Sequence, residues 1–373
     1  MTVLFYIFMT VTILEISYFC IAVYSIRGMP LQLKKSNTAI SLILYTKNQA
    51  ELVKTQLPVF LKQKHKNFEI VLINDASSDD TLEIMKRFQN ENSKIKVIDV
   101  KNIEAFWGSK KYALTLAIKA ASHERLVISS IDHKPNSTGW LQHIAAALKE
   151  KSFIIGLRKY TSKNTLFYRF FNFRELVKRC TLSKMGIVYG GTSANVSYTK
   201  TLFYSASGFA KHMQLPFGET KLFANEVSKL SNTAICLQHD NGVTQLHKPK
   251  FGTWLKEQVE EDLILRHSRK LVLLSNRFLF LCRLVFYILA VVLMIISEPE
   301  TKPLVIILLS GRFAIQYICY GIIANKLKEL KLIIALPFLD LWSLILQFVI
   351  FISGFSQNNR IGIKRSDYKS QRK

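Results

Sequence analysis

Cysteine and acidic residues are both scarce in this chain of 373 residues. No two of its five cysteines have the spacing of a zinc or redox site, which excludes a zinc module and a dithiol oxidoreductase. Reduced, inert thiols are expected instead. Histidines also lack ligand spacing, although His133 stands beside Asp132 and is kept as a candidate ligand of a metal or a diphosphate. The cysteines are Cys20, Cys180, Cys236, Cys282 and Cys319.

The shortage of acid leaves a large positive charge. Lys and Arg number 51 against 26 Asp and Glu, a formal net charge of +25. Such a surplus attracts a polyanion, either nucleic acid or an anionic membrane surface. No motif combines aromatic and basic residues for nucleic-acid recognition, and the basic residues are dispersed beside apolar runs and in the tail. We therefore expect membrane lipids, and no nucleic acid, as the anionic partner.

Four apolar runs are long enough to span a bilayer, which takes about 20 helical residues. The first is too long for the apolar region of a signal peptide and lacks basic residues before it, so an uncleaved anchor is expected. We predict an integral membrane protein with an N-terminal transmembrane anchor at 1–30, C-terminal membrane helices at 271–356 and a basic tail at 357–373. The runs are 3–26, 278–296, 304–323 and 332–354.

The charges between the runs predict an orientation. The separator 297–302 is acidic and the separator 325–331 is rich in Lys. Because Lys and Arg stay on the cytoplasmic side, the polar middle should face the cytoplasm at the inner membrane. Four crossings would however export the basic tail, so one of the last two runs is expected to be re-entrant or interfacial. Arg312 and Asp340 lie in these runs, where pairing inside the bundle and snorkelling both stay open.

The polar middle alternates short apolar strands with amphipathic helices. This order predicts an α/β domain with a mostly parallel central sheet and crossover helices. In such sheets ligands bind beyond the carboxyl ends of the strands, where Asp75 and Asp132 both lie. The expected strands are 40–44, 68–74, 96–100 and 126–130, and the expected helices are 51–63, 80–90 and 110–122.

Four stretches of this domain resemble the membrane-bound family 2 glycosyltransferases, which have a GT-A type nucleotide-sugar (Rossmann-like) fold. The resemblance implies a cytoplasmic transferase domain at 31–270 that moves a sugar from a nucleotide-sugar donor to a lipid-linked or glycan acceptor. It also implies donor-binding roles for Lys47, Asp75, Lys110 and Asn195. The stretches are 40–48, 68–81, 108–114 with the helix after it, and 190–209.

In that family an Asp-x-Asp pair holds a divalent metal against the donor diphosphate. On this match Asp132 occupies the second acidic position, and Ser130 stands in place of the first. Mg²⁺ or Mn²⁺ prefers carboxylate oxygens, so the resemblance implies a metal at Asp132 with one acid missing.

The family is also expected to supply a carboxylate base for inverting transfer to an acceptor hydroxyl. Glu219 is the candidate, although Thr220 falls where the base is most naturally aligned. As an acid at a helix N-terminus, Glu219 is equally well explained as a partner of the helix dipole.

A third motif departs from the family pattern. The Gln-x-x-Arg-Trp-like segment keeps Gln258, but Glu260, Glu261 and Asp262 stand where cations and an aromatic residue are expected. Carboxylates at these positions would repel a phosphate. Two hypotheses follow: an active glycosyltransferase with altered motifs in glycan biosynthesis, which we favour, and a degenerate transferase fold that acts as a scaffold or regulator with protein partners in a membrane complex.

Overall fold

The computed structural model describes residues 1–28, 35–101, 110–161, 165–191, 194–213 and 215–370, with side chains up to residue 354. Gly108, Ser109, Thr192 and Ser193 of the quoted stretches therefore lie outside the described residues. The chain forms two compact units. The α/β unit comprises Met29–Asn164 and Gly186–Lys248, and the helical unit comprises Met1–Gly28, Thr165–Met185 and Pro249–Lys373.

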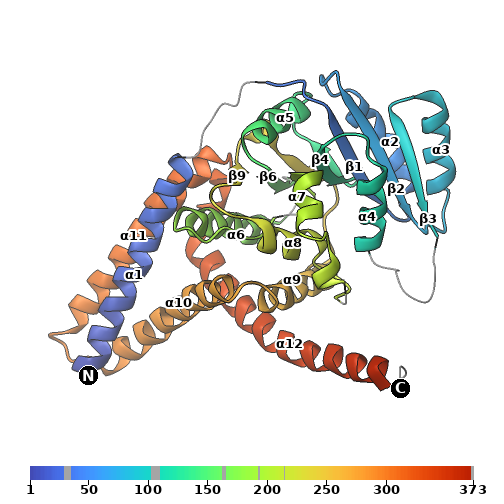
Figure 1. Ribbon diagram of the computed structural model, residues 1–373. Helices are drawn as coiled ribbons and strands as arrows, with labels where there is room; N and C mark the ends of the chain where they lie inside the picture. The colour runs from blue at the N-terminus through green and yellow to red at the C-terminus, as the bar shows by residue number, and fades with distance from the viewer. Residues whose placement is uncertain (29–34, 102–109, 162–164, 192–193, 214, 371–373) are drawn as a thin grey trace. The chain divides into compact units, whose positions relative to one another are not determined.

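The α/β unit is built on a seven-stranded sheet of order β3-β2-β1-β4-β8-β6-β9 (Figure 1). Strands β1 to β4 run parallel, and β8 is antiparallel to β4 and β6, so the predicted mostly parallel sheet is confirmed. The strands are β1 (Ile40–Thr46), β2 (Phe68–Asp75), β3 (Ile95–Val100), β4 (Arg125–Ser130), β6 (Phe153–Gly156), β8 (Val196–Thr199) and β9 (Thr233–Cys236). A second sheet holds β5 (His133–Pro135), β10 (Val243–Gln245) and β7 (Arg158–Tyr160).

Helices cover both faces of the large sheet. Leu42 and Leu44 of β1 belong to one apolar core, and Ile43 between them belongs to the other. Both cores exclude water, which explains why these strands are continuous apolar runs. The carboxyl ends of the strands are then where polar side chains can gather. One face carries α2 (Ala50–Leu61), α3 (Thr81–Glu91) and α5 (Trp140–Glu150), and the other α4 (Lys110–Ala120), α7 (Lys200–Ser205) and α8 (Glu219–Val227).

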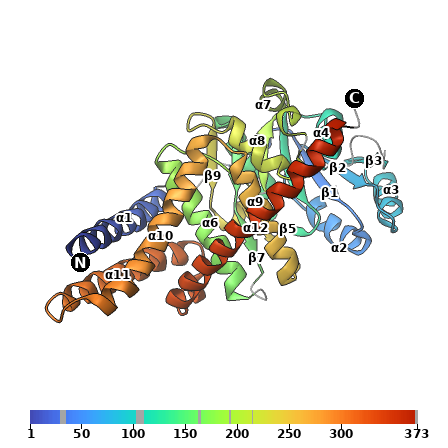
Figure 2. The ribbon, with the colours of Figure 1, turned by 90° about the horizontal axis from the view of Figure 1, so that it is seen from below.

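The helical unit contains the four predicted apolar runs. Four of its helices are long and apolar enough to cross a membrane, namely α1, α10, α11 and the part of α12 up to Gly354. Helices α1 and α11 lie side by side in both views, whereas α12 packs along α9 (Figures 1 and 2). The helices are α1 (Thr2–Arg27), α6 (Leu166–Lys184), α9 (Phe251–Arg266), α10 (Lys270–Ile296), α11 (Lys302–Lys326) and α12 (Leu336–Ser370).

Two helices whose residues fall within 31–270, α6 and α9, belong to the helical unit. The buried ring of Trp254 on α9 lies 5.1 Å from the rings of Phe167 and Phe171 on α6, centroid to centroid. Aromatic contacts at this distance add to the stabilisation from buried area. The range 31–270 therefore includes two segments, Thr165–Met185 and the part that follows Pro249, that belong to the helical unit.

Candidate functional site

The register of the sheet brings three strand ends to one rim. Tyr45 of β1 pairs with Ile73 of β2 on one side and with Ser130 of β4 on the other. Asp75 is the last residue of β2, and Asp132 follows β4 by two positions. Both predicted acids therefore lie at the carboxyl ends of neighbouring parallel strands, which is the usual location of a ligand site in this architecture.

Asp75 is held by a tyrosine and a lysine. Its Oδ2 accepts a hydrogen bond of 2.5 Å from the Tyr45 hydroxyl and lies 3.7 Å from Nζ of Lys47. Burial, followed by the hydrogen bond to Asp75, raises the pKa of Tyr45, so the phenol stays a donor. The Lys47 side chain is 49% exposed and can reach an incoming ligand. The structure thus brings Lys47 and Asp75 together and adds Tyr45.

Asp132 is an ionised carboxylate at the same rim. Its Oδ1 lies 2.7 Å from Nδ1 of His133. Burial opposes ionisation, but the hydrogen bond and charge of His133, with help from Ser130 and Lys110, hold the pKa of Asp132 well below its usual range. Its side chain remains 24% exposed, so a ligand can still approach the carboxylate.

The family resemblance implies a divalent metal at this rim, with Asp132 and its neighbours as the ligands. Within the described parts of the chain no group of three or more His, Cys, Asp or Glu could hold a metal ion. The Ser130 hydroxyl donates to the Tyr45 carbonyl at 3.4 Å. Mg²⁺ is commonly bound through one or two carboxylates together with substrate phosphates and water. Asp132 fits that minimal arrangement as a single protein ligand.

Glu219 is paired with Lys110. Gly218 adopts a left-handed conformation with φ of 79°, after which α8 begins at Glu219. The Lys110 ammonium lies 2.8 Å from Oε1 of Glu219 and 4.8 Å above the ring of Tyr45. Burial raises the pKa of Glu219, but the charge and hydrogen bond of Lys110 outweigh it and hold that pKa below its usual value. The predicted base is therefore ionised and held by the predicted donor-binding lysine.

The next residue along α4 fixes the segment before Glu219. The buried ammonium of Lys111 donates to the carbonyls of His212, Leu215 and Phe217 at 2.8, 2.5 and 2.9 Å. Burial lowers the pKa of Lys111 to about 8. Two adjacent lysines therefore position α8, one through an ion pair and one through the backbone. Sequence reasoning missed Lys111, for which no local pattern gave a signal.

Asn195 has different neighbours from the other five predicted residues. Its side-chain amide donates to the carbonyls of Leu157 and Asn241 at 2.9 and 3.0 Å, and it is 1% exposed. A Cβ on Gly156 would lie 2.3 Å from this amide. Asn195 therefore packs the backbone between the two sheets.

One acid of the third motif is neutralised within the helical unit. Asp262 accepts from Arg266 at 2.9 Å and from Arg277 at 2.6 Å. The carboxylate that stands where the family pattern has a cation or aromatic residue is thus paired with two arginines of α9 and α10.

The chain is similar to known glycosyltransferases. Residues 41–207 match the model of the Glycosyl transferase family 2. The chain is 37% identical over 93 residues to the poly-beta-1,6-N-acetyl-D-glucosamine synthase of Staphylococcus epidermidis, a match that spans 25% of this chain and 21% of that protein. The family match identifies residues 41–207 as a family 2 glycosyltransferase domain.

One solved structure has the same fold, and a second is less similar. The mannosyltransferase PcManGT from Pyrobaculum calidifontis, solved with GDP-Man and Mn²⁺, superposes with a TM-score of 0.59 at 16% identity, covering 91% of this chain and 99% of that one. TarS of S. aureus, residues 1–349 with UDP-GlcNAc, gives a TM-score of 0.43 at 14% identity, covering 80% of this chain and 92% of that one. The similarity to PcManGT confirms the GT-A fold.

Proposed function

We propose that this chain is a membrane-bound, inverting glycosyltransferase that moves a sugar from a nucleotide-sugar donor to a lipid-linked or glycan acceptor. The observation that carries the proposal is the convergence of Asp75 and the Lys110–Glu219 pair on Tyr45 at one sheet rim, where the charge of Lys110 also acts on Asp132. These groups supply a hydrogen-bond acceptor for a nucleotide, a cation ligand, a cation for phosphate and a carboxylate base.

The chemistry assigns each group a role. Asp75, supported by Tyr45 and Lys47, binds the base or ribose of the donor, and Lys110 contacts the diphosphate. A divalent ion held by Asp132 would neutralise charge on the leaving diphosphate. Glu219 takes the proton of the acceptor hydroxyl. The hydroxyl oxygen then bonds to the anomeric carbon as the sugar–phosphate bond breaks on the opposite face, so the anomeric configuration inverts.

The pairing of Lys110 with Glu219 implies that the donor binds before Glu219 takes a proton. In the described structure Glu219 is buried and engaged, so it cannot accept a proton without losing its partner. A donor diphosphate competes for the Lys110 ammonium. Binding of the donor therefore frees the Glu219 carboxylate for the acceptor, which favours transfer over unproductive proton uptake.

The proposed location is the inner membrane with the α/β unit facing the cytoplasm. The acidic separator 297–302 and the Lys-rich separator 325–331 support this orientation. The packing of α12 along the polar helix α9 supports an interfacial position for α12. Three crossings, by α1, α10 and α11, then leave the basic tail on the same side as the α/β unit.

The test is transfer of labelled sugar in membranes that contain the full chain. UDP-GlcNAc and GDP-Man are the first donors to try, because a relative is a poly-N-acetylglucosamine synthase and a structural neighbour holds GDP-Man. Label should enter the lipid or glycan fraction with wild type, and at least a hundredfold more slowly with Glu219→Gln. Equal incorporation by both proteins would refute Glu219 as base, and binding of donor without any transfer would favour the scaffold hypothesis.

A further inference from the structure

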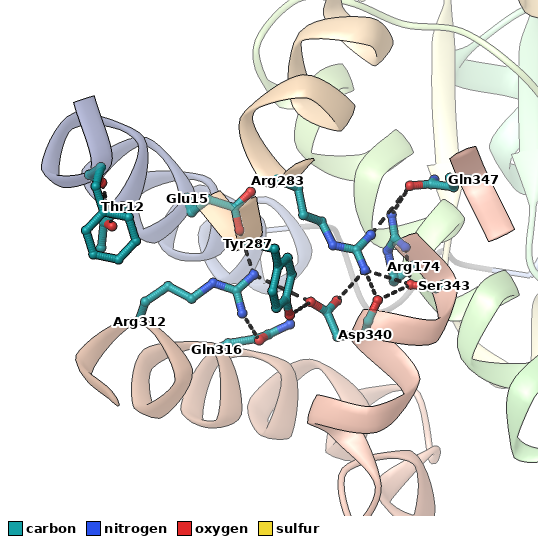
Figure 3. A network of polar contacts seen from close by, with 11 residues as sticks. Thr12, Glu15, Arg174, Arg283, Tyr287, Arg312, Gln316, Asp340, Ser343 and Gln347 are labelled. Carbon is teal, nitrogen blue, oxygen red and sulfur yellow. Dashed lines mark hydrogen bonds and ion pairs between the residues drawn. The ribbon is translucent and has the colours of Figure 1, made fainter. Parts of the chain in front are cut away.

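A buried network of charges joins four helices of the helical unit (Figure 3). Arg312 of α11 pairs with Glu15 of α1 at 2.6 Å and with Asp340 of α12 at 3.5 Å. Arg283 of α10 pairs with the same Asp340 at 3.1 Å. All four side chains are at most 8% exposed. Charges at this depth are costly unless they are compensated.

The network contains more positive than negative charge. Arg174 of α6 donates to the neutral side chains of Ser343 and Gln347 at 2.5 and 3.2 Å. Among the side chains described, no carboxylate oxygen lies within 4.0 Å of its guanidinium. The nearby Lys178 is matched by Glu175 at 2.8 Å. Three guanidinium groups, those of Arg174, Arg283 and Arg312, are thus compensated by two carboxylates.

A cavity lies against this surplus charge. Its volume is about 40 Å³, which by the usual measure holds about three waters or one small anion. Arg174, Lys178, Arg283 and Arg312 line it together with two carboxylates, those of Glu15 and Asp340. Nε of both Arg283 and Arg312 has no hydrogen-bond partner in the described structure. An anion in the cavity would satisfy unpaired donors and balance the extra positive charge at once.

The walls of the cavity indicate what kind of molecule carries the anion. Apolar side chains of Phe19, Leu279 and Phe280 also line it. It is formed by helices of spanning composition together with α6, which is not one of the candidate spans. On one side the lining reaches Phe19, Asn276 and Tyr320, near the ends of α1, α10 and α11 that the proposed topology places at the inner membrane surface. The phosphate layer of the inner leaflet is the source of anions nearest to that side. Guanidinium groups bind phosphate oxygens in a bidentate manner.

We propose that this cavity binds the phosphate group of a membrane lipid, with Arg174 as the principal ligand. A network that only holds the helices together would require no more arginines than carboxylates, because a surplus buried charge opposes folding. The inference relies on the membrane placement in the proposed function but not on sugar transfer. Donor titration of the same preparation therefore distinguishes failure of one from failure of the other.

The experiment measures binding to the full chain in a neutral detergent, by the shift of the thermal unfolding midpoint with added probe. The probes are dioctanoyl phosphatidic acid, dioctanoyl phosphatidylglycerol, inorganic phosphate and dioctanoylglycerol, which has the same chains without phosphate. We expect the two phospholipids to raise the midpoint at lower concentration than inorganic phosphate, and dioctanoylglycerol to leave it unchanged.

Variants of α6 test whether Arg174 is the principal ligand. Arg174→Gln should weaken phospholipid binding about tenfold or more, because charge-assisted hydrogen bonds are lost. Arg174→Lys keeps the charge but lacks the planar guanidinium, so its affinity for phospholipid should lie between those of wild type and Arg174→Gln. Arg179→Gln, on the same helix and outside the cavity lining, is the matched control and should bind as wild type does.

Three results would overturn the proposal. The first is equal phospholipid binding by wild type, Arg174→Gln and Arg174→Lys. The second is stabilisation by dioctanoylglycerol as strong as that by the phospholipids, which would mean that the chains alone are recognised. The third is binding of inorganic phosphate at the same concentration as the phospholipids, which would assign the site to a free anion instead of a lipid.

Discussion

Replacing Lys110 with Met should move the pH dependence of transfer. Lys110 is the main group that holds the pKa of Glu219 down against burial. The two side chains are 28% and 11% exposed, and breaking a buried ion pair of this kind costs about 3 kcal/mol at the lower end of the range. Losing the pair should therefore raise the pKa of Glu219, and since one pH unit corresponds to about 1.4 kcal/mol, the acid limb of the pH–rate profile should move by about two pH units.

The direction in which the pH dependence moves follows from which protonation state of Glu219 is stabilised. In wild type the ionised carboxylate is favoured, so the base is available down to acidic pH and activity is lost only as the pH falls through the lowered pKa. In Lys110→Met, burial is opposed only by the weaker effects of the backbone amide at Glu219 and the charge of Lys111, so the neutral acid is favoured more than in wild type. The acid limb of kcat/KM, which reports the free enzyme, should therefore move to higher pH.

The assay is initial-rate transfer of labelled sugar from pH 4 upward at saturating acceptor. Lys54→Met is the control, because that lysine is exposed on α2 and, among the residues described, pairs with its neighbour Glu51 at 2.7 Å. Its acid limb should coincide with that of wild type. An active Lys110→Met protein whose acid limb is unmoved would show that Glu219 is not the base or is not controlled by Lys110.

Three other changes test separate parts of the structure. Tyr45→Phe removes the donor to Asp75 and should raise the donor KM about tenfold with kcat nearly unchanged; a fall in kcat alone would contradict a positioning role. Lys111→Met removes the ammonium donor from three backbone carbonyls, of which only that of His212 keeps another donor among the described residues, the Leu215 amide, and should lower the free energy of unfolding by about 3 kcal/mol, measured by denaturant titration. For topology, single cysteines placed at the exposed Glu300 and in the tail 357–373 of a cysteine-free protein are labelled with an impermeant maleimide on intact spheroplasts. We expect labelling only at position 300, and labelling of the tail would contradict three crossings.

The regular parts of the α/β unit could be predicted from local patterns. The ends of the predicted strands 40–44, 68–74, 96–100 and 126–130 lie within two residues of those in the structure. They were predictable because the apolar runs alternate with segments that have the periodicity of amphipathic helices. The positions of Asp75 and Asp132 at the sheet rim followed from the rule for strand ends. The four apolar helices were predictable from length and hydropathy alone.

Long-range pairings were beyond local reasoning. Lys110 and Glu219 were both singled out, but for separate reasons, since nothing near either residue indicates that α4 and α8 meet. The contact of Tyr45 with Asp75 also depends on the pairing of β1 with β2, which periodicity does not fix in register.

The assignment of helices to units was harder still. Helix α6 was not separated from the polar domain, because its aromatic side chains are explained equally well by a soluble core and become diagnostic only beside Trp254. For Arg312 and Asp340, pairing inside the bundle was one of two open alternatives, and the structure shows it, with 3.5 Å between the charged groups.

The central claim is that the rim formed by β1, β2 and β4 binds a nucleotide sugar with the help of a cation at Asp132. Isothermal titration of the detergent-solubilised full chain with UDP-GlcNAc and GDP-Man, with and without Mn²⁺, measures this directly. We expect one donor to bind wild type in a Mn²⁺-dependent manner, and Asp132→Asn to lose the effect of the ion. Folded wild-type protein that binds neither donor, or binding that Asp132→Asn leaves unchanged with Mn²⁺ present, would contradict the account.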